Sequence, residues 1–161
     1  MKKFLFQAIG LLVLIGVAFF LFSSNFQPTN LPFVPQTPVS RMLLINGARL
    51  TIEVADTQAK RNAGLGGRQS LATDAGMLFV FDDVDKHPFW MKGLTFPLDF
   101  VWIKGDKVVD ISPNAAPPAP GQQDAYLSIY QSKEDVDKVL EVNAGTVQRL
   151  NIKAGDTIKI E

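Results

Sequence analysis

The chain has 161 residues, enough for one domain of ordinary size with or without an appendage. Sixteen basic and sixteen acidic residues give a formal net charge of zero, so a nucleic-acid partner held by bulk positive charge is not expected. The absence of cysteine excludes disulfides, thiolate metal ligands and cysteine nucleophiles, and a single histidine makes a His-rich metal site or a Ser-His-Asp triad unexpected. No pattern predicts a cofactor or a metal. The mean hydropathy of +0.11 is high for a chain with 20% charged residues, so its apolar residues must be concentrated in one part.

The first apolar segment covers residues 4–22, where Gln7 is the only clearly polar side chain. A helix of this length spans roughly 28 Å, close to the hydrocarbon thickness of a bilayer. Lys2 and Lys3 precede the segment, and the next charge is Arg41. This asymmetry predicts a single-pass signal anchor in the cell membrane, with the N-terminus in the cytoplasm and the rest of the chain outside it.

Two other interpretations of residues 4–22 remain open. Gly16-Val17-Ala18 has the small-x-small form of a signal-peptide cleavage site, and cleavage there would make the protein secreted. It would also leave an exposed apolar start, Phe19 to Phe22, on the mature chain. The third interpretation is a buried core helix. Both the anchor and the signal peptide place the following domain outside the cytoplasm.

A proline-rich linker is predicted at residues 23–40. Its prolines, Pro28, Pro32, Pro35 and Pro38, recur every three or four residues among polar side chains, which favours an extended spacer. At about 3 Å per residue the linker could hold a domain up to roughly 50 Å from the membrane. Residues 41–161 then form a domain with fourteen basic and sixteen acidic residues, a net charge of −2.

Residues 41–161 alternate between short β-type runs and turns. Asn46-Gly47 between two such runs predicts a hairpin. Asp56-Thr57 and Gly64 are typical of the start and the end of a short helix, and Asn143 is expected to cap a second helix over 144–150. A proline-rich loop is expected at 113–121. The predicted strands are residues 42–45, 50–54, 77–81, 89–91, 98–103, 107–111, 138–142 and 157–160.

These elements predict a mainly β domain, either a single compact β-sandwich or a partly open barrel with two short helices, behind an N-terminal transmembrane helix. The pattern has no strand–helix alternation of the length that a doubly wound nucleotide-binding fold requires. It therefore favours a small all-β core over a nucleotide-binding enzyme.

A set of motifs in this domain resembles the family known as domain of unknown function 192. The motifs are Arg61-x-x-Gly64-Leu65-x-Gly67-Arg68, Gly76-Met77-Leu78-Phe79-Val80-Phe81, Phe89-Trp90-Met91-Lys92, Pro97-Leu98-Asp99, Val139-Leu140-Glu141-Val142-x-Ala144-Gly145 and Gly155-Asp156. They cover nearly all of residues 50–161, and their order carries the resemblance more than any one motif does. The resemblance implies a small β-rich sandwich or barrel, often behind an export signal, and it implies no activity.

The chain departs from the family pattern at two places. Gly66 stands where the family usually has Met, and Gly93-Leu94 stands where it usually has Asn-Thr. The second departure removes hydrogen-bonding side chains from the loop that is the best candidate for a site.

That loop runs from Trp90 to Asp99. In one interpretation it forms a ligand-binding groove, in which Trp90 offers a stacking face while Lys92 and Asp99 offer opposite charges. In the other, Lys92 and Asp99 form a structural ion pair and Trp90 belongs to the core. A glycan-binding site requires an exposed aromatic face, so burial of Trp90 would exclude it.

Two further residues are candidates for ligand binding. Glu141 lies in the middle of a predicted strand, and with Asp99 it could form the carboxylate pair of a hydrolase, tuned by Lys92, if both share one cleft at roughly 5 to 10 Å. The alternative is a glutamate on the solvent face. Arg68 follows the glycines at 64–67, but without a Walker pattern it is expected to pair with an acid such as Asp74.

The acidic turn with the only histidine is expected to be a solvated turn. Asp83, Asp85 and His87 alternate there, but Lys86 intrudes and the glycine and distal glutamate of a calcium loop are missing. His87 is expected at the surface.

Together these features predict a membrane-anchored extracytoplasmic domain that binds an envelope glycan, peptide or protein. No catalytic set is complete, so enzymatic activity is not the first expectation. The first alternative is a hydrolase that uses Asp99 and Glu141. The second is a structural or assembly component of the envelope, expected if the largest exposed apolar patch lies outside the Trp90 loop. The candidate binding residues are Trp90, Lys92, Asp99, Glu141 and Arg68.

Overall fold

The computed structural model describes residues 40–161, which belong to one contact unit, Pro38–Glu161. The anchor expected at residues 4–22 and all of the linker expected at residues 23–40 except Ser40 lie outside the described residues. Within the described part, no helix is long and apolar enough to cross a membrane.

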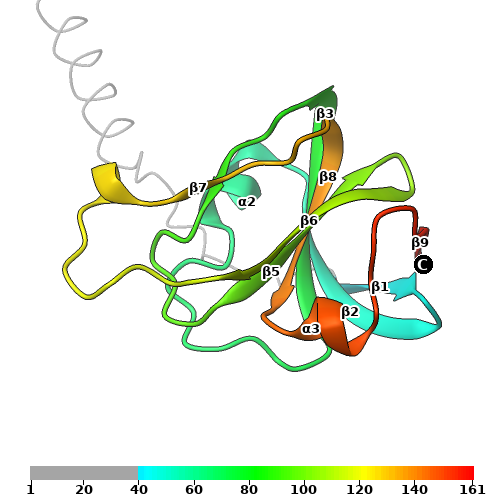
Figure 1. Cartoon of the computed structure of the whole chain (residues 1–161), viewed down its shortest axis with the longest axis horizontal. Helices are drawn as coiled ribbons and strands as arrows, with labels where there is room; N and C mark the ends of the chain where they lie inside the picture. The colour runs from blue at the N-terminus through cyan, green and yellow to red at the C-terminus, as the bar shows by residue number, and fades with distance from the viewer. Residues whose placement is uncertain (1–39) are drawn as a thin grey trace, which may run out of the picture. The chain divides into compact units, whose positions relative to one another are not determined.

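Nine strands and two short α-helices make up the domain, which confirms the mainly β class (Figure 1). Every predicted strand is present, while a short strand and a 3-10 helix between residues 124 and 130 were not predicted. The elements are β1 (Ser40–Ile45), β2 (Ala48–Ala55), α2 (Gln58–Ala63), β3 (Ala75–Asp85), β4 (Phe89–Trp90), β5 (Leu98–Lys104), β6 (Lys107–Ala115), η1 (Asp124–Tyr126), β7 (Ile129–Tyr130), β8 (Val136–Asn143), α3 (Thr146–Arg149) and β9 (Ile158–Ile160).

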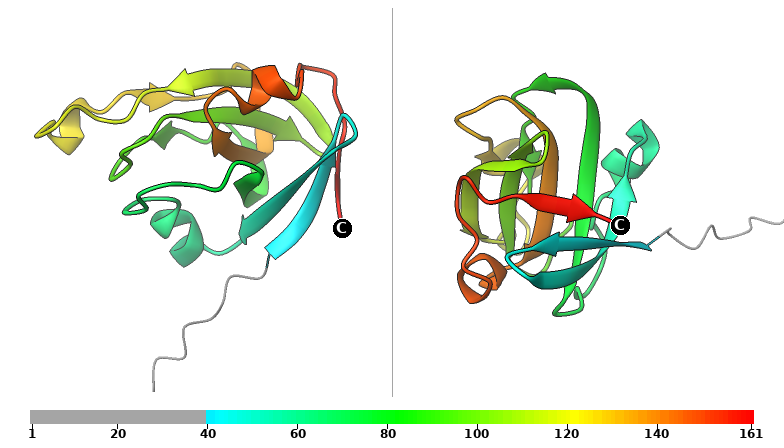
Figure 2. Two further views of the ribbon diagram at one scale, coloured as in Figure 1. Left: turned by 90° about the horizontal axis from the view of Figure 1, so that it is seen from below. Right: turned by 90° about the vertical axis from the view of Figure 1, so that its right-hand side faces the viewer.

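Seven of the strands form one sheet in the order β6-β5-β8-β3-β2-β1-β9. The sheet curls into a half-barrel, as Figure 2 shows from two sides. The curl brings the chain before β9 to the start of β6, where Val108 donates its N–H to the Asp156 carbonyl at 2.9 Å and Lys107 bridges to Thr157. Of the two predicted architectures, the partly open barrel is therefore the closer one.

The predicted turns form as their residue types require. In the β1–β2 hairpin Asn46 and Gly47 have positive φ angles of 49° and 77°, which asparagine and glycine tolerate best. Thr57 caps α2 by accepting a hydrogen bond from the Lys60 N–H at 3.3 Å, and Gly64 follows the helix with φ of 48°. These turns fix where α2 begins and ends.

One local expectation, that Asn143 caps the second helix, is wrong, and one connection was not predicted. Strands β2 and β3 are parallel, because residues 56–74, including α2, form a crossover long enough to return the chain to the same end of the sheet. Asn143 belongs to β8 and does not cap α3; its side-chain amide donates to the carbonyls of Leu71 and Ala72 at 3.0 Å each. Asn143 thus fixes the crossover, and Gly145 takes the N-cap position.

The two faces of the sheet carry two separate cores. The barrel core lies inside the curl and contains side chains from all seven strands, among them Leu43, Leu78 and Leu140. The ribbon core lies on the other face, around Phe100 and Trp102. It is covered by the two-stranded β4–β7 ribbon, a separate sheet.

The ribbon attaches to the sheet through its inward-facing rings. Phe89 and Tyr130 are register partners in the ribbon, and their rings lie 5.6 Å and 5.2 Å from the ring of Phe100. Because side chains alternate along a strand, the next pair, Trp90 and Ile129, faces away from the core, and both are exposed.

Candidate functional site

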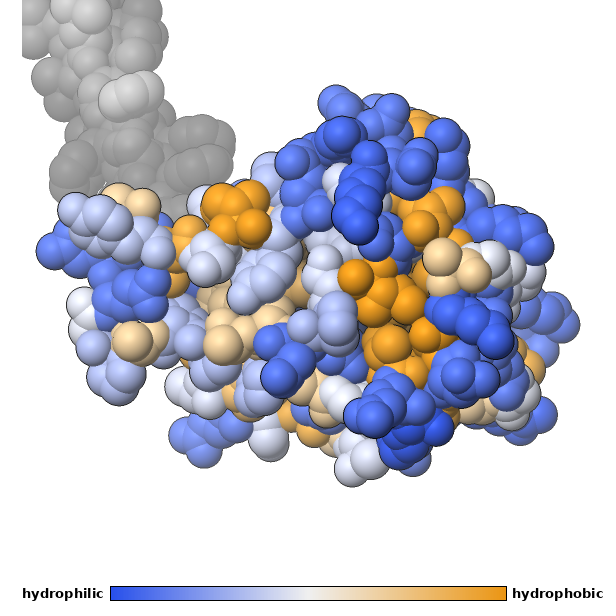
Figure 3. All heavy atoms as spheres, viewed as in Figure 1, coloured by the Kyte–Doolittle hydropathy of each residue, from blue (hydrophilic) through white to orange (hydrophobic). Residues whose placement is uncertain are grey.

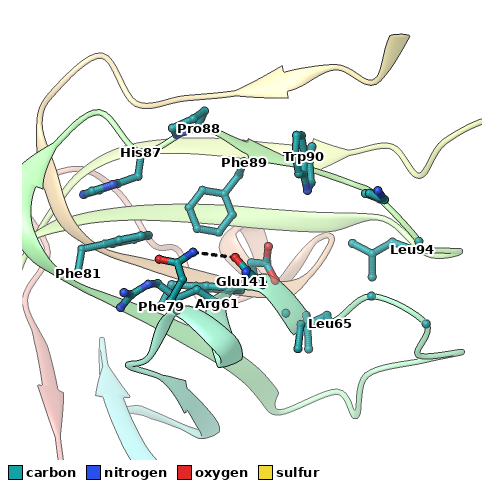
Figure 4. A pocket seen from close by; sticks show the side chains of 18 residues that line it. Arg61, Leu65, Phe79, Phe81, His87, Pro88, Phe89, Trp90, Leu94 and Glu141 are labelled. Carbon is teal, nitrogen blue, oxygen red and sulfur yellow. Dashed lines mark hydrogen bonds between the residues drawn. The ribbon is translucent and has the colours of Figure 1, made fainter. Parts of the chain in front are cut away.

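A cleft of about 570 Å³ opens beside the ribbon core. Residues 58–67, from α2 and the turn after it, form one wall, and residues 87–94, which include β4, form the other. Side chains from the sheet, such as Phe79 and Glu141, line the cleft between these walls (Figure 4). The volume is in the range of small-molecule sites.

Aromatic side chains dominate the cleft. The rings of Phe79 and Phe89 meet edge to face at 4.9 Å, and Phe81 stacks on His87 at 3.6 Å. Trp90 also lines the cleft but is 57% exposed, so its indole face is available to a ligand (Figure 4). The interpretation in which Trp90 belongs to the core is therefore wrong.

The two walls touch at one end through glycine backbone. The Gly67 N–H donates to the Gly93 carbonyl at 2.9 Å, and a Cβ added to Gly66 would lie 3.3 Å from the Lys92 carbonyl oxygen. Gly93 itself has φ of 69°, which favours glycine. The two departures from the family pattern thus meet in space, and the lack of side chains there lets the loops approach each other.

Glu141 is the most unusual residue of the cleft. It is 4% exposed, and its register neighbours on β3 and β5 are Met77 and Phe100. No residue between 40 and 161 donates a hydrogen bond to its carboxyl group, and burial raises its pKa to about 8. The carboxyl is therefore mostly protonated at neutral pH, and the alternative of a solvent-facing glutamate is wrong.

Asp99 does not belong to this cleft. It pairs in register with Val142, the residue after Glu141, so Asp99 and Glu141 point to opposite faces of the sheet. The Asp99 carboxylate is 1% exposed and accepts backbone N–H groups of Asn114 at 2.8 Å and Val147 at 3.0 Å. The hydrolase hypothesis, which needs both carboxylates in one cleft, is overturned by this placement.

Lys92 lines the cleft but does not pair with Asp99 as one interpretation expected. Its Nζ lies 2.5 Å from Oδ2 of Asp124 in η1. The ion pair is exposed, so it contributes little stability, but it connects the loop after β4 to the segment before β7.

Arg68 lies outside the cleft, and the prediction that it pairs with Asp74 is wrong. It binds Glu53 on β2 with both guanidinium nitrogens, Nη2 being 2.8 Å from Oε2. Asp74 instead lies 3.3 Å from Nη2 of Arg149. Arg68 therefore attaches the loop after α2 to the sheet.

Two cleft residues were missed by sequence reasoning. Arg61 donates from Nη1 to the Val80 carbonyl at 2.7 Å, and its guanidinium lies 5.3 Å from the centre of the Phe81 ring. His87, expected at the surface, is stacked on Phe81, and its buried Nε2 has no hydrogen-bond partner within residues 40–161. The Arg61 motif was visible in the sequence, but no local pattern places it against a strand nineteen residues away.

The acidic turn does not assemble a cation site. His87 Nε2 lies 3.8 Å from Oδ1 of Asp83, beyond hydrogen-bond distance. Across the described residues, no group of three or more histidine or acidic side chains is placed to hold a metal ion.

The family model of DUF192, described as "Uncharacterized ACR", matches residues 41–160. Two crystal structures share the fold. A Sinorhizobium meliloti 1021 protein, described provisionally as a transcription regulator, is 33% identical with a TM-score of 0.68, over 76% of this chain and 95% of its own. A Novosphingobium aromaticivorans DSM 12444 protein of unknown function is 29% identical with a TM-score of 0.65, over 78% of this chain and 89% of its own. No curated protein in the comparison matches the chain. The alignments span nearly the whole of both solved chains, so each of those chains consists almost entirely of this β domain.

Proposed function

Since the chain belongs to the DUF192 family, which is uncharacterised, we propose its function from the cleft itself: the domain is a binding module for a glycan of the cell envelope. The observation that carries this proposal is the exposed Trp90 indole at the rim of a cleft whose interior holds an unpartnered carboxyl group, Glu141. A sugar ring offers an apolar face and several hydroxyl groups, so it needs both kinds of contact.

Other side chains of the cleft are suited to the same ligand. Gln58 donates its amide to Oδ1 of Asn62 at 2.7 Å, so these two planar amides are held together at the wall formed by α2. Arg61 adds a guanidinium that no carboxylate within residues 40–161 neutralises. Amides and guanidinium groups donate and accept in the geometry that ring hydroxyls require. A peptide or a protein would use the same surface but would not need so many planar polar groups.

The proposed location rests on residues 1–40. The apolar run at 4–22, the preceding lysines and the proline-rich linker support a membrane-anchored domain outside the cytoplasm. The description of the Sinorhizobium protein is not carried over, because residues 41–161 have a net charge of −2 and offer no bulk positive charge for nucleic acid.

Binding can be tested on the 38–161 fragment with four oligosaccharides: cellotetraose, maltotetraose, tetra-N-acetylchitotetraose and chitotetraose. We expect at least one of them to shift the Trp90 indole N–H and the amides of residues 58–67 in a two-dimensional NMR titration. Trp90→Ala should weaken that binding by about tenfold, since loss of an aromatic stacking surface costs about 1–3 kcal/mol. Val84→Ala, which removes an exposed apolar side chain outside the cleft, is the matched control. Shifts confined to other regions, or none, would refute the proposal.

A second candidate is the assembly role, which one observation favours. On the face shown in Figure 3, apolar side chains gather over the region of β6, away from the β4–β7 ribbon, and hydrophilic side chains surround them. Strand β6 is an edge of the sheet. Light scattering of the fragment at increasing concentration tests self-association, and a constant monomer mass would argue against this role.

A further inference from the structure

The Glu141 carboxyl lacks what buried polar groups normally have. Most buried polar side chains make at least one hydrogen bond within the protein. Among the described residues, the one fully buried side-chain polar atom without a partner is Nε2 of His87, so the carboxyl oxygens of Glu141 are open to the cleft. Glu141 is only 4% exposed, and no donor within residues 40–161 makes a hydrogen bond to its carboxyl oxygens. It nevertheless lines the cleft, as Figure 4 shows. A ligand in the cleft can supply the missing partner.

The surroundings of Glu141 decide which partner suits it. The elements that pack on it from the sheet contribute apolar side chains, Met77 from β3 and Phe100 from β5. The titratable side chains that line the cleft from the two walls are all basic, namely Arg61, His87 and Lys92. Glu141 is the only acid among the lining residues of the described chain.

From this arrangement, and resting on the proposed glycan-binding function, we infer that Glu141 binds a ring hydroxyl of a neutral sugar as an uncharged acid. It donates one hydrogen bond to the hydroxyl oxygen and accepts another at its carbonyl oxygen. The cleft thereby selects a neutral hydroxylated ligand over an amino sugar or another cation, and Glu141 is a specificity-determining residue.

A cationic ligand fits the cleft less well for two reasons. It would need the ionised carboxylate, which burial among apolar side chains disfavours. It would also approach the guanidinium of Arg61, which no carboxylate within residues 40–161 neutralises and which repels it, whereas the charge of Lys92 is balanced by Asp124. A neutral acid and a hydroxyl group each donate and accept, so both can be satisfied while the Glu141 carboxyl stays uncharged.

The inference makes binding depend on pH in a defined direction. The raised pKa of about 8 for Glu141 means that the neutral acid is lost between pH 7 and pH 9, and its population falls about tenfold over that range. Affinity for a neutral oligosaccharide should therefore fall by about tenfold. A ligand whose positive charge does not titrate in this range, bound by the carboxylate, would show the opposite trend.

The test uses calorimetric titration of the oligosaccharide that shifts the Trp90 indole, at pH 7 and pH 9. We expect Glu141→Gln, whose amide also donates and accepts, to keep the affinity within about threefold at pH 7 and to remove the pH dependence. Glu141→Leu should lose at least fivefold at pH 7, because about 1 kcal/mol of hydrogen bonding is lost. Glu134→Gln, which changes an exposed glutamate outside the cleft, should keep the wild-type dependence between pH 7 and pH 9.

Each other outcome overturns the inference. If the affinity rises with pH, if Glu141→Gln abolishes binding, or if chitotetraose binds more tightly than tetra-N-acetylchitotetraose, Glu141 acts as an anion. If the wild-type affinity is the same at both pH values, Glu141 does not contact the ligand. In these cases glycan binding itself still stands. If none of the four oligosaccharides binds, the proposed function fails and the inference fails with it.

Discussion

Asp99 and Glu141 lie on adjacent strands, one register position apart, and are about equally buried, yet their environments are opposite. Asp99 faces the barrel side of the sheet, where two backbone N–H groups hold its carboxylate. Glu141 faces the ribbon side, where no N–H group of the described chain reaches its carboxyl. The first residue has all the partners it needs within the fold, and the second has none.

This difference shows which of the two buried acids is available to bind a ligand. The N–H groups bound to Asp99 belong to β6 and α3, so this carboxylate fixes the position of two elements. Both carboxylate oxygens of Asp99 already accept backbone hydrogen bonds, so a ligand could bind them only by breaking those bonds and destabilising the fold. Glu141 destabilises the empty domain, and binding can recover that free energy. Burial alone would not have separated the two roles.

The largest expected effect is on the pH dependence of stability through Glu141. The folded pKa of about 8 lies above the unfolded value near 4.5, so the folded state holds the proton more tightly between these values. The free energy of unfolding should therefore fall as pH rises through this window. Relative to the wild type, Glu141→Gln should be more stable by about 3 kcal/mol at pH 7 and nearly equal at pH 4.5.

Urea unfolding of the 38–161 fragment at pH 4.5 and pH 7 measures this difference. Glu134→Gln removes an exposed glutamate and should give a difference from the wild type that does not change with pH. Equal pH dependence in Glu141→Gln and the wild type would show that Glu141 finds a partner in solution, and the contrast with Asp99 would disappear.

The next effect is a loss of stability at Asp99. Asp99→Ala leaves the N–H groups of Asn114 and Val147 without an acceptor. Because hydrogen bonds to a charged group contribute about 1.5–3 kcal/mol each, we expect the free energy of unfolding to fall by about 3 kcal/mol. Asp82→Ala, at an exposed position, should change it by less than about 0.5 kcal/mol. A similarly small loss for Asp99→Ala would mean that the hydrogen bonds to Asp99 do not stabilise the fold, and the contrast between the Asp99 and Glu141 carboxyl groups would not hold.

The smallest effect is expected at the Arg68–Glu53 ion pair. Its contribution to stability should depend on pH in the direction opposite to that of Glu141, which sharpens the comparison. The hydrogen bond from Arg68 lowers the pKa of Glu53, so its contribution is present above the unfolded pKa and is lost as pH falls through the folded one. Because both side chains are partly exposed, Glu53→Gln should cost about 1 kcal/mol or less at pH 7. The cost should shrink towards pH 3 in urea unfolding. A cost that grows on acidification would contradict the pairing.

Local sequence patterns were sufficient to predict most elements of the fold. The Asn46-Gly47 hairpin and the Thr57 to Gly64 limits of α2 follow from turn and capping preferences that act over a few residues. The 3-10 helix and β7 escaped prediction because the two-residue strand Ile129–Tyr130 is defined only by its pairing with Phe89–Trp90. That pairing joins segments about forty residues apart, which no local pattern encodes.

The placement of the candidate binding residues was predicted in part, for a related reason. Trp90, Lys92 and Glu141 line one cleft, while Asp99 and Arg68 do not. The alternation of strand residues indicates that neighbours point to opposite faces, but it does not give the register between β5 and β8. A shift of one residue in that register would have changed which acids share a face.

By itself the sequence determined that an apolar N-terminal segment precedes a mildly acidic, cysteine-free β domain, because charge, hydropathy and turn residues are properties of short segments. Only the tertiary structure decided that the Asp99 carboxylate meets backbone donors from β6 and α3 while the Glu141 carboxyl meets apolar side chains and an open cleft. The partners of a buried acid come from strands and loops far away in the chain, and their positions follow from the curl of the sheet and the ribbon that covers it.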